Sequence, residues 1–404
     1  MELPRTAGWR ALGGRKILLG ITGSVAAYRA VDLARNLIRL GAEVRALLTP
    51  SALRFVGKAL VEWATGSEAI VEETWRAEHV ELAEWADALV IAPATLNTLA
   101  KIAHGIGDNA VTLTALTVLG SAKRLVVVPT MNERLMKSPQ YGLVIDRLRG
   151  MGVVVVPPLL EEGKAKFPPI EDLSHCIWAS IDRGFDLAGL RALVTAGPTY
   201  ERIDPVRVIT NPSSGLMGVL IARELACRGA SVDVVHGPVR HRPPYLAKNF
   251  EVKTTAEMAR KVGELTLAEQ YDLAFFAAAP ADYRPAEQHE RKVPTREVER
   301  MTLELVRTEK VVGRVAKRPR VLAIFAAETP AREEDLVEAG ARKLMEIGAD
   351  IVVANDVSSD VAGFSKDLLK AIIITREGVE RVGLVEKPRL SRLLVDMALR
   401  FLQR

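Results

Sequence analysis

The sequence predicts an α/β protein built from two Rossmann-like domains. Short, continuous apolar runs rich in valine, isoleucine and leucine alternate with segments of helical spacing, which is typical of a parallel sheet covered by helices on both faces. The same pattern restarts near residue 190, and 404 residues are enough for two such domains. We therefore expect a boundary between residues 184 and 189, which gives domains 1–186 and 187–404.

In the first half, a strand, a helix and a second strand open the chain. Residues 16–21 form a continuous apolar run, residues 25–41 have helical spacing and include a final glycine, and residues 43–48 form the next apolar run. Three further strands are predicted at residues 88–94, 124–130 and 152–158.

The first strand leads through a turn of small residues into the first helix, in the segment GITGSVAAY. Small residues let backbone N–H groups approach an anion, and a helix N-terminus favours negative charge. Gly23, Ser24 and Ala26 are therefore a candidate phosphate cradle. The alternative is a tight turn that binds nothing.

Polar residues follow two later strands of this half. Thr95 and Asn97 come directly after one strand, and Asn132 follows the next. Ligands of open α/β sheets bind outside the carboxyl ends of strands, so these side chains are candidates for cofactor and substrate binding. His79, which precedes a helical segment, is a candidate base; taken alone, such a histidine is more often a surface residue.

The second half repeats the architecture without an evident sequence repeat. Residues 211–215, here called the NPSSG loop, lie between a predicted strand and a helix and are rich in small and hydroxylated side chains that suit a phosphoryl or acyl-phosphate group. Asp282 ends a later strand, and Lys292 and Lys343 supply positive charge suited to phosphates. The predicted strands lie within residues 191–198, 230–238, 272–285, 320–330 and 349–359.

Composition limits the classes of function. Hydrophobic residues make up 49% of the chain and charged residues 26%, with a net charge of +5, which favours small anionic ligands. No lysine/arginine block is interleaved with aromatic residues, so nucleic acid is not an expected partner. Short apolar runs and an N-terminus without a signal-peptide core predict no membrane segment, and two cysteines predict a reducing, cytoplasmic location.

Four motifs of the first half resemble the flavin-dependent cysteine decarboxylases, specifically phosphopantothenoylcysteine decarboxylase. They are GITGSVAAY, HVELAEWAD, APATLNTLAK and PTMN, and the resemblance covers roughly the first 180 positions. It implies FMN at the strand ends, His79 as the base and Asn132 as the group that binds the substrate's carboxylate; Thr130 replaces the family's usual alanine. The implied FMN-binding residues are Gly23, Ser24, Ala26, Thr49, Pro93, Ala94, Thr95 and Asn97.

Seven motifs of the second half resemble phosphopantothenate–cysteine ligase: TAGPT, DPVR, NPSSGLMG, ADYRP, KVP, FAAET and ANDV. The resemblance implies that Asn211 assists the acyl-nucleotidylate step and that Lys292 serves both catalysis and nucleotide binding. Ile347 replaces a usual lysine, and the residues at 309–310 replace a usual proline–aspartate pair. The implied CTP site consists of Phe276, Ala277, Ala278, Asp282, Lys292, Glu309, Lys310, Val311, Val312, Phe325 and Lys343.

The two resemblances together imply a bifunctional enzyme of coenzyme A biosynthesis. Such an enzyme joins L-cysteine to 4'-phosphopantothenate in a CTP-dependent reaction through an acyl-cytidylate, then decarboxylates 4'-phosphopantothenoylcysteine to 4'-phosphopantetheine with FMN. Mg²⁺ or Mn²⁺ is expected to neutralise the pyrophosphate leaving group, with no ligands assigned. The residues themselves leave CTP against ATP open, and the preference for CTP comes from microbial fused relatives.

The family resemblance also implies a homo-oligomer, as large as a dodecamer. The alternative is an active ligase fused to a non-catalytic flavin-fold module that serves oligomerisation or regulation. A dehydrogenase is disfavoured because no G-x-G-x-x-G with a following acidic residue is present.

The segment GKAKFPPIEDL, residues 163–173, falls where the decarboxylase family has a flap over the flavin. The family's flap commonly carries a cysteine that reprotonates the product, but this segment has none, and Cys176 beyond it is expected to be a small buried hydrophobe. Lys164 and Lys166 are the candidate replacements, as proton donors if burial lowers the pKa of either amine, or as ligands for the substrate phosphate.

Overall fold

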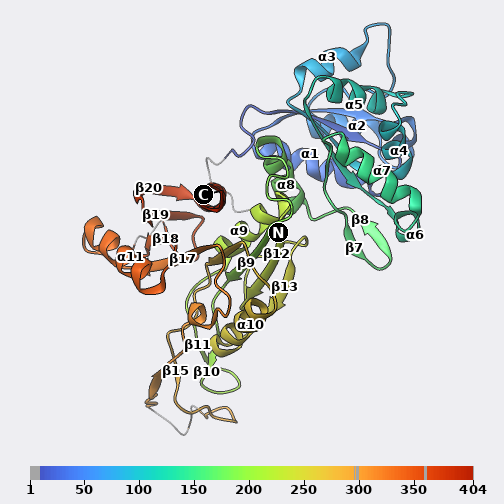
Figure 1. Ribbon diagram of the computed structural model, residues 1–404. Helices are drawn as coiled ribbons and strands as arrows, with labels where there is room; N and C mark the ends of the chain where they lie inside the picture. The colour runs from blue at the N-terminus through green and yellow to red at the C-terminus, as the bar shows by residue number, and fades with distance from the viewer. Residues whose placement is uncertain (1–9, 295, 297–299, 359–361, 404) are drawn as a thin grey trace. The chain divides into compact units, whose positions relative to one another are not determined.

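The computed structural model describes residues 10–294, 296, 300–358 and 362–403 (Figure 1). The chain divides into two compact units, made up mainly of residues 7–186 and residues 187–404. Both units are open, mainly parallel sheets packed between helices, which confirms the predicted fold class.

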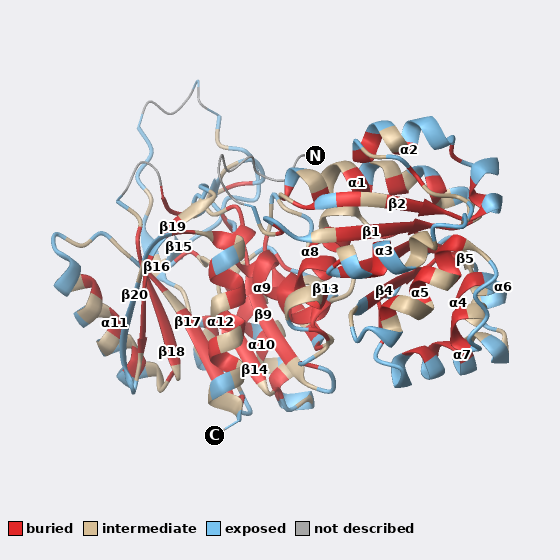
Figure 2. Ribbon diagram, turned by 90° about the horizontal axis from the view of Figure 1, so that it is seen from above, coloured by how far each residue is buried: buried red, intermediate tan, exposed pale blue. Residues whose placement is uncertain are grey.

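The first unit contains a five-stranded parallel sheet of order β2-β1-β3-β4-β6. This is the flavodoxin-like order 2-1-3-4-5, whose direction reverses between β1 and β3. The central strands are buried along almost their whole length, as their continuous apolar sequences require (Figure 2). The strands are β1 (Lys16–Ile21), β2 (Glu43–Leu48), β3 (Ala88–Ala94), β4 (Arg124–Pro129) and β6 (Val154–Val155).

Helices cover both faces of this sheet. The predicted helix 25–41 begins as a single 3-10 turn, and its last two residues lie beyond the helix. The elements are η1 (Val25–Tyr28), α1 (Arg29–Arg39), η2 (Pro50–Arg54), α2 (Lys58–Thr65), α3 (Glu78–Trp85), α4 (Leu96–Ala103), α5 (Ala110–Gly120), α6 (Glu133–Met136), α7 (Pro139–Gly150) and α8 (Ile170–Asp182). Cys176 is buried within α8, but it is disulfide-bonded and not a free cysteine, so the prediction that it is only a small buried hydrophobe is wrong.

Part of the segment predicted as a flap loop is regular structure. β7 (Leu159–Glu161) and β8 (Lys164–Lys166) form an antiparallel hairpin, and β8 also pairs with β5 (Met131–Asn132). Glu162 and Gly163 form the turn with φ values of 51° and 66°, a left-handed backbone that matches the twist of a two-residue hairpin. The strand signal was missed because a lysine–alanine–lysine strand has neither β-branched nor aromatic residues.

The second unit is an eight-stranded sheet of order β13-β12-β9-β14-β17-β18-β19-β20. Its first six strands are parallel and follow the Rossmann order 3-2-1-4-5-6, with the reversal between β9 and β14; the last two pairings are antiparallel. The strands are β9 (Arg191–Ala196), β12 (Ser231–His236), β13 (Lys248–Glu251), β14 (Leu273–Phe276), β17 (Val321–Glu328), β18 (Ile351–Asp356), β19 (Leu368–Thr375) and β20 (Gly378–Glu386).

Two short antiparallel ribbons extend from this unit (Figure 1). They are β10 (Glu201–Arg202) with β11 (Val208–Ile209), and β15 (Tyr283–Pro285) with β16 (Leu305–Arg307). The helical elements of the unit are α9 (Leu216–Cys227), α10 (Thr255–Ala268), η3 (Val311–Arg314), α11 (Glu333–Ile347) and α12 (Lys387–Leu402).

Gly218 sets how closely α9 packs on β9. A Cβ at this position would lie 2.6 Å from the Cβ of Ala196 and 2.8 Å from the carbonyl oxygen of Thr195. Gly218→Ala is expected to lower the free energy of unfolding by about 1–3 kcal/mol, because strand or helix must shift, although alanine is the better helix former. Urea-induced unfolding followed by circular dichroism measures the change.

Gly142 is the matched control for this substitution. It lies in α7, and a Cβ there meets nothing within 4 Å. Gly142→Ala is therefore expected to raise stability by up to about 1 kcal/mol through helix propensity alone. Equal effects of the two alanines would contradict the packing argument.

Candidate functional site

Two candidate sites lie at the points where strand order reverses, one in each unit. In open α/β sheets the loops on either side of such a point diverge and leave a crevice at the carboxyl ends of the strands. In the first unit these loops follow β1 and β3, and in the second they follow β9 and β14.

In the first unit, Thr22 ties the ends of β1 and β3 together. Its hydroxyl donates to the carbonyl of Pro93 at 2.8 Å and accepts from the N–H of Thr95 at 3.1 Å. The predicted residues Pro93, Ala94 and Thr95 are thereby fixed beside the turn that follows β1. Thr22 was not predicted, because a buried threonine between strand and turn carries no distinguishing sequence signal.

The predicted cradle is a close-packed turn. A Cβ on Gly23 would lie 2.4 Å from the hydroxyl oxygen of Ser51, so only glycine fits. Ser24 caps η1 by accepting from the N–H of Ala26 at 3.3 Å, and η1 runs on into α1. The N–H groups of Ala26 and Ala27 are therefore bonded within the turn, to the hydroxyl and the carbonyl of Ser24, so an anion at this helix start would share or replace these acceptors.

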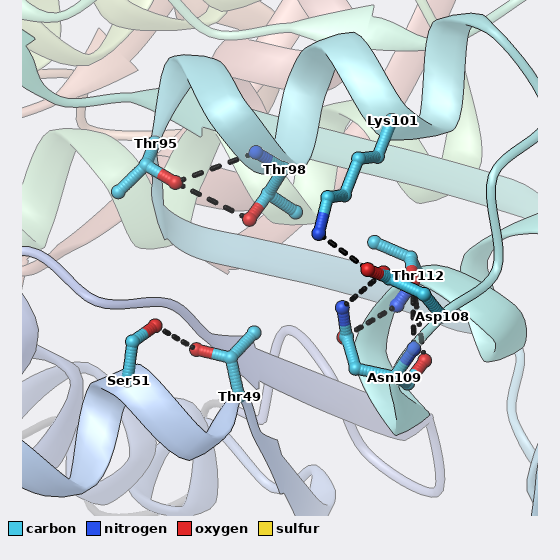
Figure 3. Close-up of polar contacts among 8 residues, drawn as sticks. All are labelled: Thr49, Ser51, Thr95, Thr98, Lys101, Asp108, Asn109 and Thr112. Carbon is cyan, nitrogen blue, oxygen red and sulfur yellow. Dashed lines mark hydrogen bonds and ion pairs between the residues drawn. The ribbon is translucent and has the colours of Figure 1, made fainter.

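Hydroxyl side chains flank the cradle at two further element ends (Figure 3). Thr49 precedes η2 and shares a 3.0 Å hydrogen bond with Ser51. Thr95 caps α4 by accepting from the N–H of Thr98 at 3.4 Å, and Asn97 is exposed in the first turn of that helix. The structure thus brings the predicted FMN-binding residues to one edge of the sheet.

An ion pair that was not predicted joins α4 to the start of α5 (Figure 3). Lys101 lies 2.5 Å from Asp108, and this lysine lowers the pKa of the Asp108 carboxyl. Asn109 donates to Asp108 at 2.9 Å and caps α5. These bonds join the last turn of α4 to the residues that precede α5.

His79 lies in the first turn of α3, where Glu73 holds its ring. The Nδ1 atom of His79 is 2.9 Å from Oε2 of Glu73, and the backbone N–H of His79 donates to the same oxygen at 3.4 Å. With Nδ1–H donating to Glu73, Nε2 is left as the acceptor that a general base needs. Glu73 was not predicted, since a glutamate six positions before a histidine belongs to no motif.

Asn132 and Lys164 face each other across the β5–β8 pairing. The side-chain oxygen of Asn132 accepts from the N–H of Arg134 at 2.9 Å, which leaves the amide N–H₂ as the group able to bind a carboxylate. Directly opposite pairs of an antiparallel ladder share one face, so Lys164 lies on the same face as Asn132.

Lys166 differs from Lys164 in its partners. Its amine lies 2.9 Å from Glu162 and 3.4 Å from Glu161, both on the same hairpin. The hydrogen bond to Glu162, followed by that to Glu161, raises the pKa of Lys166. A proton donor would need the opposite shift, so the expectation that burial lowers the pKa does not hold for Lys166.

These residues fit an anionic flavin nucleotide. The predicted set is uncharged, lies at the start of three helical segments and contains a glycine turn that a side chain would fill. Thr130, buried at the end of β4, has a hydroxyl oxygen with no hydrogen-bond partner among the described residues. A buried hydroxyl without a hydrogen-bond partner, next to Met131 and Asn132, is typical of a site that binds a polar ligand.

In the second unit, Asn211 ties the NPSSG loop to the end of β14. Its amide donates to the carbonyls of Ala279 at 3.2 Å and Pro280 at 3.0 Å. Gly215, with a φ of 78°, turns the chain into α9, and a Cβ there would lie 2.3 Å from Val239. The loop is therefore a fixed structure at the reversal point rather than a flexible connector.

A cavity of about 620 Å³ opens beside the ends of β14 and β17. Phe276, Leu322 and Ile324 give it an apolar part, while Lys310 and Lys343 bring positive charge to it. The predicted nucleotide-binding residues that line it are Phe276, Ala278, Asp282, Glu309, Lys310, Val311, Val312, Phe325 and Lys343.

The two lysines that line the cavity are paired with carboxylates. Lys310 lies 2.6 Å from Asp282, and Lys343 lies 2.8 Å from Glu328. Both pairs are solvent-accessible, so each contributes little to stability and can exchange partners with a ligand.

Two predicted residues do not line this cavity. Ala277 donates its N–H to the carbonyl of Thr195 at 3.2 Å, and Lys292 is exposed on the loop between β15 and β16. That loop is tied to the DPVR motif, because Arg207 donates to the carbonyl of Val293 at 3.1 Å and Asp204 accepts from its N–H at 3.3 Å. Burial acts to raise the pKa of Asp204, but the backbone N–H donors outweigh it and lower the pKa overall.

Neither a metal-binding cluster nor a membrane-spanning helix occurs among the described residues. Within the ranges given above, no group of three or more histidine, cysteine, aspartate or glutamate residues could hold a metal ion. No helix of the described chain is both long and apolar enough to cross a membrane.

Comparison with family models gives one match for each unit. A model described as "Flavoprotein" matches residues 7–182, and one described as "DNA/pantothenate metabolism flavoprotein C-terminal domain" matches residues 187–401.

Relatives match almost the whole chain. The coenzyme A biosynthesis bifunctional protein CoaBC of Thermococcus kodakarensis is 36% identical over 393 residues, covering 96% of this chain and 95% of that protein. The protein of the same name from Escherichia coli K12 is 31% identical over 417 residues, covering 96% and 97%. Among solved structures, the C-terminal domain of a CoaBC protein is 31% identical, with a TM-score of 0.43, and covers 54% of this chain and 98% of that one.

Proposed function

Because the chain belongs to the family of bifunctional coenzyme A biosynthesis proteins, we propose that it catalyses two consecutive steps of that pathway. Residues 187–404 join L-cysteine to 4'-phosphopantothenate at the expense of CTP, through an acyl-cytidylate. Residues 1–186 decarboxylate the resulting 4'-phosphopantothenoylcysteine to 4'-phosphopantetheine with FMN. The observation that supports this most is one cradle at each strand-order reversal, since two such sites suit two reactions.

In the decarboxylase site, the protein supplies binding and proton handling. Bound FMN would supply the reversible two-electron oxidation of the cysteinyl unit that lets the carboxylate leave. The free amide N–H₂ of Asn132 binds that carboxylate, and Nε2 of His79 takes a proton from the substrate. Gly23, Ser24 and Thr95 offer N–H and hydroxyl donors for the phosphate of the flavin.

Lys164 is our candidate for the final proton donor, in place of the flap cysteine of relatives. Lys164→Ala is expected to slow formation of the reduced thiol product by about 10²-fold and to release the unreduced ene-thiol, because the step loses its acid. Lys166→Ala, which removes an amine held by the hairpin's own glutamates, is the control and is expected to keep the normal product. Chromatography of the thiol products measures both, and normal product from Lys164→Ala would mean that the proton comes from another group.

In the ligase site, the apolar part of the cavity is suited to the nucleoside and Lys343 and Lys310 to its phosphates. The pantothenate carboxylate attacks the α-phosphate of CTP and displaces pyrophosphate, a step that Asn211 assists. The amine of cysteine then attacks the acyl carbon of the acyl-cytidylate and displaces CMP. Lys292, which is exposed, is proposed to contact the phosphates of the nucleotide. Magnesium would be held mainly by the nucleotide's own phosphates, as is usual for this ion.

We also propose a homo-oligomer, as large as a dodecamer. Exposed apolar side chains on the ribbons of the second unit support self-association: Val206 is 64% exposed and Tyr283 46%. Light scattering after gel filtration gives the mass, and a monomer at micromolar concentration would contradict the proposal.

The proposed function is tested with the purified full chain and added FMN. Phosphopantothenate, cysteine and CTP are expected to give pyrophosphate, and the product is expected to release carbon dioxide. Replacing CTP by ATP tests the choice of nucleotide. Pyrophosphate release without carbon dioxide release would instead assign the first unit to a non-catalytic flavin-fold module.

A further inference from the structure

Lys387 is a buried ammonium group whose position is unfavourable on three counts. The residue is only 2% exposed. Burial lowers the pKa of its amine to about 8, and the negative charge of Asp367 opposes this shift only in part. It is also the first residue of α12, where the positive end of the helix dipole opposes a cation. Among the described residues, the hydrogen-bond acceptors of its amine are main-chain carbonyls and not carboxylates.

Those carbonyls belong to residues 362–366, here called the AGFSK segment. The amine of Lys387 donates to the carbonyl of Gly363 at 2.8 Å and of Phe364 at 3.2 Å. Gly363 has a φ of 131°, a backbone conformation that other residues rarely adopt, and this lets its carbonyl face the lysine. Lys387 therefore fixes the path of the AGFSK segment.

The AGFSK segment in turn holds the NPSSG loop by two hydrogen bonds. The hydroxyl of Ser214 donates to the carbonyl of Phe364 at 3.3 Å, the same oxygen that Lys387 binds. The hydroxyl of Ser365 donates to the carbonyl of Pro212 at 2.6 Å. Ser214 also accepts from the N–H of Leu216 at 3.4 Å, at the start of α9.

We propose that Lys387 is a positioning residue of the ligase site, which acts through the AGFSK segment to hold the NPSSG loop and its Asn211 in place. One carbonyl oxygen, that of Phe364, receives both the lysine and the loop's serine, so the two cannot move independently. The kinetic part rests on the proposed ligase function. The structural part does not, because it concerns the unliganded chain alone.

Hydrogen exchange of the unliganded full chain tests the structural part. Lys387→Met keeps the stem and removes the ammonium, and it is expected to speed amide exchange about 10-fold or more in residues 209–216 as well as 362–367. A lysine that only stabilises α12 would change exchange in 362–367 and α12 and leave 209–216 as in the unaltered protein. That result would overturn the proposal.

Ser365→Ala distinguishes the proposed coupling from a general loss of stability caused by Lys387→Met. Ser365 is exposed, so its loss leaves the buried ammonium in place, yet exchange in 209–216 is still expected to rise. The matched control is Lys123→Met, since Lys123 also binds only main-chain carbonyls among its recorded acceptors, at 2.7–2.8 Å, but in the first unit. Lys123→Met is expected to change neither exchange in 209–216 nor ligation.

Kinetics distinguish positioning from loss of the nucleotide site. The cavity-lining residues include none from 211–215 or 362–366, so Lys387→Met is expected to lower kcat for pyrophosphate release about 10-fold and keep KM for CTP within twofold. Lys387→Arg, which keeps the donor, is expected to recover most of kcat. A raised KM for CTP with normal kcat would overturn the proposal. If the unaltered protein catalyses no ligation, the proposed ligase function is refuted. The hydrogen-exchange test of the structural part would still be valid.

Discussion

Replacing His79 by glutamine is expected to lower the rate of carbon dioxide release by about 10²–10⁴-fold, the usual contribution of a general base. Glutamine is similar in size and its amide can still donate to Glu73, so the start of α3 keeps its hydrogen bonds. What is lost is a nitrogen that can accept a proton at neutral pH. Ligation, in the other unit, is expected to be unchanged, and both rates are measured in one preparation.

His104 provides the control for this substitution. It is an exposed histidine at the end of α4 whose ring binds a carbonyl of its own helix, that of Ala100, at 2.8 Å. His104→Gln is expected to change neither reaction by more than about twofold. Near-normal carbon dioxide release from His79→Gln would remove this residue from the role of base and favour the non-catalytic reading of the first unit.

Site residues that directly follow a strand could be predicted from the sequence, because the apolar run before them and the helix start after them mark their position in the sheet. Gly23 and Ser24 follow a continuous apolar strand and precede a helix, and a parallel sheet brings such turns to one edge. The same rule placed Thr95 after β3. Apolar runs, small turns and helix starts are readable within a window of about ten residues.

Contacts between distant segments could not be predicted in this way. The β8 strand pairs with β5 across more than thirty positions, and its sequence, lysine–alanine–lysine, carries no strand signal of its own. Lys387 binds carbonyls 23 and 24 positions away, and a main-chain acceptor leaves no mark in the sequence. The sequence could not exclude Lys166 as a proton donor, because its ion pairs with Glu161 and Glu162 form only when the hairpin brings these side chains together.

Replacing Asn211 by aspartate is expected to lower the rate of pyrophosphate release by about 10²–10³-fold, the range seen when one fixed donor of a reacting centre is lost. The Asn211 amide donates to two carbonyls at the end of β14, and a carboxylate would set negative charge against both oxygens. The NPSSG loop would then move away from the end of β14. Carbon dioxide release from supplied phosphopantothenoylcysteine is expected to be unchanged.

Asn249 allows the same chemical change to be made away from the site. Its amide also donates to two main-chain carbonyls, of Pro244 at 3.2 Å and Ala247 at 3.1 Å, but on the exposed strand β13. If loss of such a pair of bonds simply weakened the fold, Asn249→Asp and Asn211→Asp would lower thermal stability and ligation alike. We expect ligation to fall only in Asn211→Asp, because only the NPSSG loop is proposed to carry a group that assists the reaction of the pantothenate carboxylate. Equal ligation rates in the two variants would mean that the NPSSG loop binds no reacting group.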